Sequence, residues 1–234
     1  MKLGLLALTF SPIAYAYTYG LGTSWSIGTG SSSTIEKVTT TLNAGIPPSG
    51  QLGELILWPA LSNGTGDLLM TSVESWSNQS WCGGVTGQWC IRTQVFHDQK
   101  STFGAFAPLS ASEPVTITFE RNPDASGWTQ SAIVNNNVVS MISSSSGPMT
   151  LFGMSTECDD YCAMTVSPQT YTNTTIILDV ANPTWGATEV IGSRIYGDGT
   201  IDTNAQQPTI VDGITSSEDG KVWTITNITI PQLG

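Results

Sequence analysis

Short apolar runs separated by turn residues are the main pattern of this chain, and within the runs apolar and polar positions alternate with a period of two. The runs Val115–Phe119 and Val222–Ile228 show this alternation most clearly, and it is typical of strands that bury one face. Asn135-Asn136-Asn137 separates two of the runs and predicts a hairpin turn. We predict strands at residues 37–44, 54–61, 67–75, 88–96, 114–122, 128–134, 138–143, 174–181, 189–194 and 222–230.

The number and spacing of these strands indicate the fold class. Many short strands with turn residues between them and little helical periodicity predict an all-β protein. An antiparallel β-sandwich of the jelly-roll (concanavalin-like) type, with a concave sheet, fits this pattern. No internal repeat or linker interrupts the sequence, so we expect residues 17–234 to form a single domain.

The first residues predict the compartment. Lys2 precedes the apolar run Leu3–Phe10, and Ala14-Tyr15-Ala16 fits a small-x-small cleavage site, so residues 1–16 have the pattern of a secretory signal peptide. That run is too short to span a bilayer, and no later run reaches the roughly 18 apolar residues that a span needs. We therefore expect a protein of the secretory pathway, secreted or held in a vesicle or lumen, with no membrane partner.

Cysteines and glycosylation sequons agree with this compartment. The four cysteines form two local pairs in sequence, Cys82 with Cys90 and Cys158 with Cys162. An even number in a secreted chain predicts two disulfides, and of the three pairings we favour the two local ones. Four Asn-x-Ser/Thr sequons predict N-glycans; they stand at Asn63, Asn78, Asn173 and Asn227.

The net charge excludes one class of partner, and the motifs exclude several kinds of chemistry. Only seven Lys and Arg residues oppose 18 Asp and Glu, giving a net charge of −11, so a nucleic acid would be repelled. The sequence has no G-x-S-x-G, no phosphate-binding loop and no dinucleotide fingerprint. Acidic turns such as Asp198–Asp202 resemble a calcium loop only loosely, because the terminal Glu is missing. We expect no cofactor and no metal.

Two segments resemble the fungal glutamic peptidases (the eqolisins), which are secreted acid peptidases built as a β-sandwich with a concave sheet. Leu68-Leu69-Met70-Thr71-Ser72-Val73 is similar to the strand that carries the family's catalytic Gln. The segment from Thr172 to Asp179 is similar to the strand that carries the family's catalytic Glu. Gly53–Trp58 is similar to a strand of the family that lies upstream of both. The resemblance implies that the sandwich and its groove are kept.

The same resemblance implies that the peptidase chemistry is lost. The position of the Gln holds Met70, and the position of the Glu holds Thr175. A glutamic peptidase needs a carboxyl as acid and base and an amide that polarises the scissile carbonyl, and neither Met nor Thr can do these tasks.

In overall character the chain also resembles the hetero-Diels–Alderases of fungal tropolone–sesquiterpenoid pathways, which are small, signal-bearing proteins of similar length without a cofactor motif. This resemblance implies a pericyclase that joins a tropolone quinone methide to a sesquiterpene alkene such as humulene. Such a cycloaddition needs no nucleophile, metal or redox cofactor, and orientation of two apolar partners lowers its barrier. The expected partners are therefore apolar small molecules, and an exposed apolar groove edge could support a homodimer.

The candidate site residues follow from the strands of the expected groove. Arg92, Gln94 and His97 are the nearest hydrogen-bond donors and are the predicted catalytic residues. By the two-residue period, Arg92 and Gln94 lie on the opposite face of their strand from Trp89, so they serve the groove only if the strand bulges or the groove uses that other face. The predicted substrate-binding residues are Trp58, Met70, Ser72, Glu74, Trp89, Ile91, Thr175 and Ile177.

Three other functions stay open on the sequence. A lectin-like sandwich could stack sugars on its tryptophans, of which Trp58, Trp76, Trp81 and Trp89 lie on or beside the strands of the expected groove. A hydrolase or polysaccharide lyase could use Glu74 with an unrecognised partner. A glutamic peptidase could use Gln94 together with Glu74 in place of the residues at the matched positions.

Overall fold

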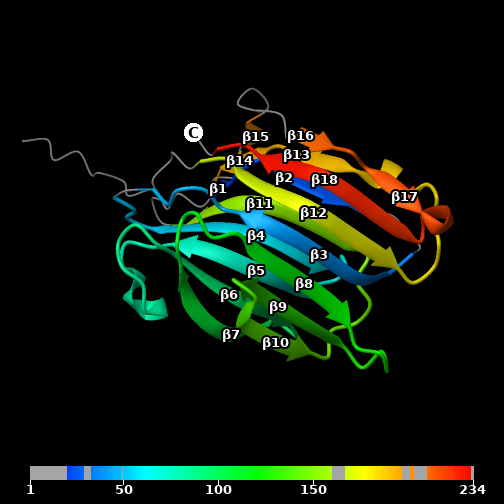
Figure 1. Cartoon of the computed structure of the whole chain (residues 1–234), viewed down its shortest axis with the longest axis horizontal. Helices are drawn as coiled ribbons and strands as arrows, with labels where there is room; N and C mark the ends of the chain where they lie inside the picture. Colours follow the sequence, from blue (N-terminus) through cyan, green and yellow to red (C-terminus); the bar gives the residue numbers. More distant parts are fainter. Residues whose placement is uncertain are drawn as a thin grey trace, which may run out of the picture.

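Two antiparallel β-sheets make up the described part of the protein (Figure 1). The computed structural model describes residues 20–28, 33–48, 50–159, 167–196, 201–202 and 210–232. These residues contain strands and three short 3₁₀ turns, η1 (Gln79–Cys82), η2 (Trp185–Thr188) and η3 (Glu218–Gly220), and no α-helix. The all-β class predicted from the sequence is confirmed.

The first sheet, called sheet A, carries the candidate site. Its main strand order is β15-β14-β1-β11-β4-β5-β6-β7, and β2 pairs with both β11 and β13. Its strands are β1 (Gly20–Leu21), β2 (Ser24–Ile27), β4 (Glu54–Ser62), β5 (Leu68–Ser75), β6 (Trp89–His97), β7 (Lys100–Leu109), β11 (Leu151–Asp159), β13 (Val190–Gly192), β14 (Arg194–Tyr196) and β15 (Ile201–Asp202).

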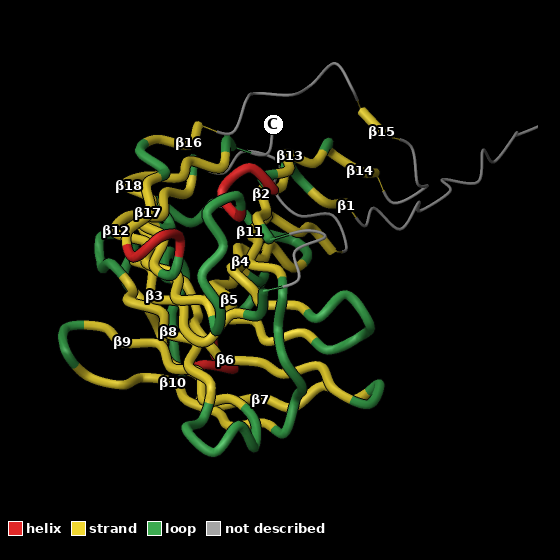
Figure 2. Tube along the Cα trace, turned by 90° about the vertical axis from the view of Figure 1, so that its right-hand side faces the viewer, coloured by secondary structure: helices red, strands yellow, loops and turns green. Residues whose placement is uncertain are grey.

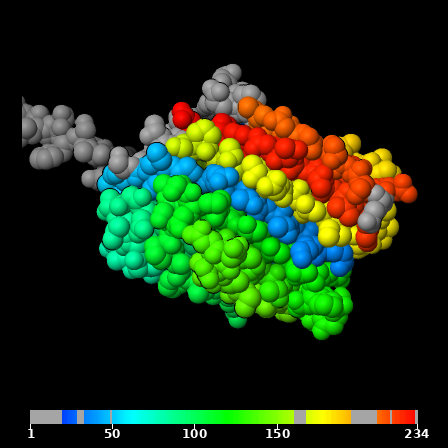
Figure 3. All heavy atoms as spheres, viewed as in Figure 1, coloured from blue at the N-terminus to red at the C-terminus, as the bar shows by residue number. Residues whose placement is uncertain are grey.

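The second sheet, called sheet B, faces the viewer in Figure 1 and forms the adjacent diagonal bands of Figure 3. Its order is β10-β9-β8-β3-β12-β18-β16, with β17 also paired to β18. Its strands are β3 (Ile35–Asn43), β8 (Val115–Arg121), β9 (Trp128–Val134), β10 (Asn137–Ser144), β12 (Gln169–Leu178), β16 (Ile210–Asp212), β17 (Thr215–Ser217) and β18 (Val222–Ile230).

The core lies between the two sheets, which Figure 2 shows side by side. The period of two puts alternate apolar residues of each strand on the inner face. Sheet A contributes Trp89 and Ile91 from β6, and sheet B contributes Phe119 from β8 and Tyr171 from β12, all of them fully buried. The β-sandwich prediction is therefore confirmed.

Most predicted strands coincide with observed ones, and the differences have local causes. The prediction for 222–230 matches β18, whereas the one for 174–181 gives only the last part of β12. Asn135 and Asn136 both have positive φ and join β9 to β10, which confirms the hairpin turn. The sequence analysis missed β7 and β11, because glycines interrupt the alternation in both strands.

The disulfide between Cys82 and Cys90 is present, as predicted. Cys158 is also disulfide-bonded, while Cys162, the partner that we favoured, lies outside the described residues. The predicted signal peptide, residues 1–16, lies outside them too. No helix within the described ranges is long and apolar enough to cross a membrane.

A β-bulge in β7 determines which side chains face outward at this edge of sheet A. Arg92 pairs with Phe106 and Gln94 pairs with Phe103, so two residues of β7, Gly104 and Ala105, stand opposite Thr93 alone. An extra residue shifts the alternation by one. Phe103 and Phe106 therefore both point to the outer face, although in a regular strand residues three apart point to opposite faces.

The bulge also ties the two sheets together. Because Thr93 has no partner on β7, its backbone N–H donates to Ser140 Oγ of β10 at 2.9 Å, and Ser140 Oγ in turn donates to the carbonyl oxygen of Ala105. A Cβ atom at Gly104 would lie 2.2 Å from Thr93 Oγ1 and 2.7 Å from the carbonyl oxygen of Met141. Only glycine allows β10 to approach this closely.

We expect Gly104→Ala to destabilise the fold by about 1–3 kcal/mol, because the added methyl group clashes with β6 and β10. Gly147→Ala is the matched control, since its added Cβ meets nothing within 4 Å, and it should change stability by less than about 0.5 kcal/mol. Urea denaturation measures both changes. An equal effect of the two substitutions would show that β10 does not close on the bulge.

Candidate functional site

The outer face of sheet A presents cross-strand rows of side chains. In one row, Ser155 of β11 pairs with Trp58 of β4, and Ser72 of β5 pairs with Arg92 of β6; the register between β4 and β5 places Trp58 across from Ser72. In the next row stand Ala60, Met70, Gln94 and Phe103. Neighbouring strands are about 4.8 Å apart, so each row crosses four strands within about 15 Å.

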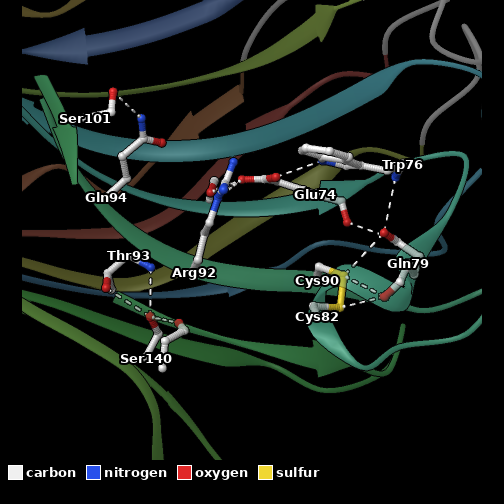
Figure 4. Close-up of polar contacts among 12 residues, drawn as sticks. Glu74, Trp76, Gln79, Cys82, Cys90, Arg92, Thr93, Gln94, Ser101 and Ser140 are labelled. Atoms are coloured by element: carbon white, nitrogen blue, oxygen red, sulfur yellow. Dashed lines mark hydrogen bonds and ion pairs between the residues drawn. A yellow bond between two sulfur atoms is a disulfide. The ribbon is translucent and has the colours of Figure 1, made fainter. Parts of the chain in front are cut away.

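The centre of this face is an ion pair between Arg92 and Glu74. Arg92 Nε lies 2.7 Å from Glu74 Oε1, and the Glu74 side chain is 0% exposed while that of Arg92 is 16% exposed (Figure 4). Ser72 Oγ donates to the same carboxylate oxygen at 2.5 Å, and Trp76 Nε1 donates to Oε2 at 2.9 Å. Three donors thus compensate the buried carboxylate for the water that it has lost.

Aromatic rings surround the guanidinium group. Its central carbon lies 4.4 Å from the ring centroid of Phe103, 5.1 Å from that of Trp81 and 6.0 Å from that of Trp76. These distances are within the range of cation–π attraction. We call Trp76, Trp81 and Phe103 the aromatic cage; Phe106 packs against Trp81 with centroids 5.5 Å apart.

The turn η1 brings Trp81 over Arg92. Asn78 caps the turn by accepting a hydrogen bond from the backbone N–H of Ser80, and Gly83 ends it with a φ of 79°. The buried Gln79 side chain donates to the carbonyl oxygens of Glu74 and Gln88. The disulfide from Cys82, the last residue of η1, to Cys90 on β6 attaches the turn to the same strand that carries Arg92.

Of the three nitrogens of the Arg92 guanidinium, only Nε has a hydrogen-bond partner among the described residues. Neither terminal nitrogen belongs to the buried groups without a partner, so these N–H donors are open to solvent. The outer face therefore offers a held cation that can donate to an oxygen of a bound molecule.

The structure brings six predicted site residues together on this face and separates five others from it. Those on the outer face of sheet A are Trp58, Met70, Ser72, Glu74, Arg92 and Gln94. Arg92 and Gln94 lie on the face of sheet A opposite to Trp89, as the two-residue period predicted, and Met70 lies on that same face.

Four other residues that we predicted for the groove lie elsewhere in the structure. Trp89 and Ile91 are fully buried in the core between the sheets, because they alternate with Arg92. Thr175 and Ile177 belong to β12 of sheet B and alternate with the buried Ile176 and Leu178, so they lie on the other side of the molecule from Met70. Short segment similarity could not reveal that β5 and β12 belong to different sheets.

The sequence analysis also missed residues that the structure places at the site. Phe103 and Phe106 were not among the candidates, because the segment Lys100–Leu109 was not predicted as a strand. The available signal was Gly104 between two phenylalanines, since an isolated glycine in a strand often marks a bulge. Trp76 and Trp81 were noted beside the groove strands but were not chosen as site residues. Trp76 precedes η1 and Trp81 belongs to it, and no strand pattern predicts the position of that turn.

His97 is not part of this cluster. It lies five residues beyond Arg92 at the end of β6, about 16 Å along the strand. Its Nδ1 is 2.9 Å from Asp67 Oδ1, and the backbone N–H of Gly147 donates to Asp67 Oδ2 at 3.3 Å. The hydrogen bond that His97 donates to Asp67 raises the pKa of His97 above its ordinary value of 6.5. Desolvation lowers it, and the charges of Asp67 and Asp98 raise it further.

The four sequon asparagines differ in their surroundings. Asn78 and Asn173 are exposed, and Asn63 is half-buried in the turn between β4 and β5. Asn227 lies within β18, between β12 and β16, and its Nδ2 donates to Thr229 Oγ1. In the described part of the chain no group of three or more His, Cys, Asp or Glu side chains is arranged to hold a metal ion.

Comparison with known proteins places the fold. Neither a family model nor a curated protein sequence matches the chain. Scytalido-glutamic peptidase, solved with a transition state analog inhibitor, is similar in structure with a TM-score of 0.53 at 14% identity, over 90% of this chain and 98% of that chain. SCP-B, an eqolisin solved with the tripeptide Ala-Ile-His, has a TM-score of 0.48 at 13% identity, over 93% of this chain and 98% of that chain.

The fold of this protein is thus similar to that of a glutamic peptidase. The residues available for peptidase chemistry are arranged differently from what we considered. Gln94 pairs with Met70, four residues from Glu74 along β5, which is about 13 Å, and Gln94 Nε2 donates to Ser101 Oγ. Glu74 and Gln94 thus start from well-separated backbone positions, and each side chain is hydrogen-bonded to other residues of the protein.

We expect Glu74→Ala to destabilise the protein by about 3 kcal/mol, because it leaves the Arg92 guanidinium without its partner. The control is Glu120→Ala, which removes the exposed pair with Lys37 and should cost less than about 1 kcal/mol. Guanidinium chloride denaturation compares the two. Similar small losses would mean that the Arg92–Glu74 pair does not organise this face.

We expect the stabilising contribution of the His97–Asp67 pair to be lost as the pH rises. Since the pKa of His97 in the folded protein exceeds 6.5, the folded chain binds the proton more tightly than the unfolded chain. The contribution is then full below pH 6.5 and falls as the pH passes through the raised pKa. NMR titration of the single imidazole gives this pKa directly.

Two variants separate the causes of this shift. Asp67→Asn should return the pKa of His97 towards 6.5, whereas Asp98→Asn should lower it less, since Asp98 acts only through its charge. A wild-type pKa at or below 6.5 would contradict the hydrogen bond to Asp67.

Proposed function

We propose that this protein is a cofactor-independent hetero-Diels–Alderase of fungal secondary metabolism, acting in the secretory pathway. It joins a tropolone quinone-methide heterodiene to a sesquiterpene alkene such as humulene on the outer face of sheet A. The observation that carries the proposal is the Arg92 guanidinium, which Glu74 holds in place, rings surround and solvent reaches. The disulfide between Cys82 and Cys90 supports an oxidising compartment.

The chemistry needs a donor and an oriented pair of substrates. A hydroxymethyl tropolone loses its alcohol oxygen as water, the ring hydroxyl supplies the second proton of that water, and the ring oxygen becomes the carbonyl of the heterodiene. The exocyclic carbon then bonds to one alkene carbon and the carbonyl oxygen bonds to the other, which closes a dihydropyran ring. No redox partner is needed.

Arg92 acts on the oxygen whose charge changes in this reaction. A terminal N–H that donates to the carbonyl oxygen makes the heterodiene more electron-poor and stabilises the negative charge that develops on that oxygen. The aromatic cage gives a flat apolar surface against which the tropolone ring can pack. Glu74 is a positioning residue, because its carboxylate fixes the direction of Arg92.

The same geometry disfavours hydrolysis by Glu74. Its carboxylate is fully buried and accepts hydrogen bonds from Ser72, Trp76 and Arg92. A general acid or base must reach the substrate, and this carboxylate is committed to the protein.

One observation favours a second function, the binding of carbohydrate. Phe103 and Phe106 lie on the edge strand β7 with exposed fractions of 45% and 50%. Exposed rings next to a charged donor could stack on sugar rings and bind their hydroxyl groups. A lectin-like module is therefore the alternative that the experiment must distinguish.

The test incubates the purified chain with a hydroxymethyl tropolone and humulene, and follows the products by chiral chromatography. We expect a faster reaction than in buffer and a single stereoisomer. Arg92→Met should slow the reaction by about 100-fold, the usual effect of removing one charge-stabilising donor. Products formed at the buffer rate and in the buffer isomer ratio would overturn the proposal.

Arg121→Met is the matched control. Arg121 forms an ion pair with Glu36 in sheet B, so its removal should leave the reaction unchanged. Titration with soluble oligosaccharides in parallel tests the alternative: saturable sugar binding that Phe106→Ala abolishes, without any effect on the cycloaddition, would favour the lectin.

A further inference from the structure

An apolar hollow lies on the same outer face, beside the Arg92–Glu74 pair. Its volume is about 160 Å³, and it opens between β2, β4, β5 and β11. Ala60 pairs with Gly153, and Gly153 pairs with Ser26, so small residues form its floor. It is lined chiefly by Trp58, Ala60, Ser62, Leu68, Leu151 and Gly153.

The register places this hollow at a defined distance from Arg92. Ala60 is across from Met70, and Arg92 is across from Ser72, so the two sites are two strands apart sideways and two residues apart along the strands. These offsets correspond to about 12 Å. Met70, which is 8% exposed, lies between them on β5, so a ligand can cross from one to the other over an apolar surface.

The lining of the hollow indicates the chemistry of its occupant. No charged side chain lines it, and apolar cavities of about 150 Å³ bind benzene-sized hydrocarbons in other proteins. The hollow therefore accepts one end of a hydrocarbon, about the size of an isoprene unit, and gives no partner for a charged group.

Trp58 adds a second indication. Its indole nitrogen is buried, and it has no hydrogen-bond partner among the described residues. An occupant of the hollow therefore meets the carbon atoms of the indole and not its N–H group. These carbon atoms give a flat apolar surface against which a hydrocarbon can pack.

We infer that this hollow is the subsite for the hydrocarbon substrate, with one end of the molecule packed against Trp58 and the rest lying over Met70 towards Arg92. The inference rests on the proposed function for the identity of the hydrocarbon. The existence of the subsite is tested by binding of the hydrocarbon alone and does not depend on any reaction.

The experiment measures binding of humulene alone to the full chain, by tryptophan fluorescence and by saturation-transfer NMR, with no tropolone present. We expect saturable binding of humulene. Ala60→Leu fills the hollow and should weaken binding at least about tenfold. Ser62→Leu, at the half-buried rim, should weaken it too and serves if Ala60→Leu does not fold.

Two further variants show which idea fails if one does. Thr118→Ile, on the outer face of sheet B, is the control for added bulk and should bind humulene as the wild type does. Arg92→Met should slow the proposed cycloaddition by about 100-fold while humulene still binds, because Arg92 lies about 12 Å from the hollow. Binding that is absent, or that is unaffected by both Ala60→Leu and Ser62→Leu, would overturn the subsite; intact binding without cycloaddition would overturn only the proposed function.

Discussion

A carboxylate without water is the constraint around which one side of this molecule is organised. Glu74 points from the outer face of sheet A but is fully buried, and such a group needs donors from the protein. Ser72 precedes it by two residues on the same face, Trp76 follows it by two, and Arg92 comes from the neighbouring strand. Each donor that satisfies the carboxylate is thereby fixed in position, and Arg92 then gives the aromatic cage its centre.

The second constraint is the close approach of the two sheets at their β7 and β10 edges. The bulge leaves the backbone N–H of Thr93 without an acceptor on β7, and Ser140 Oγ accepts its hydrogen bond. Glycine at position 104 leaves the space that Ser140 needs. The same bulge turns Phe103 and Phe106 to one side. The bulge is therefore the single cause of two features, the close packing between the sheets and the two exposed rings on the outer face. It explains how an edge strand can carry apolar residues at a site.

The sequence predicted the fold well, because strands with one buried face leave a clear period of two, as in β8 and β18. It predicted part of the site for the same reason: Met70, Ser72 and Glu74 share a face by parity, and so do Arg92 and Gln94. It could not predict which sheet each strand joins, so Thr175 and Ile177 were grouped with Met70 although β12 belongs to sheet B. Nor could alternation reveal Phe103 and Phe106 across a bulge, or Trp81 on a turn held by a cross-link and by the hydrogen bonds of Gln79.

That cross-link has a consequence for how the protein is produced. Trp81 reaches Arg92 on a turn that the bond between Cys82 and Cys90 attaches to β6, and Cys158 is disulfide-bonded as well. Chain made where thiols stay reduced lacks both restraints, and the first of them holds one wall of the cage. Material from a reducing cytosol can then keep the apolar core between the sheets and still present an incomplete binding surface, so the site needs an oxidising compartment to form.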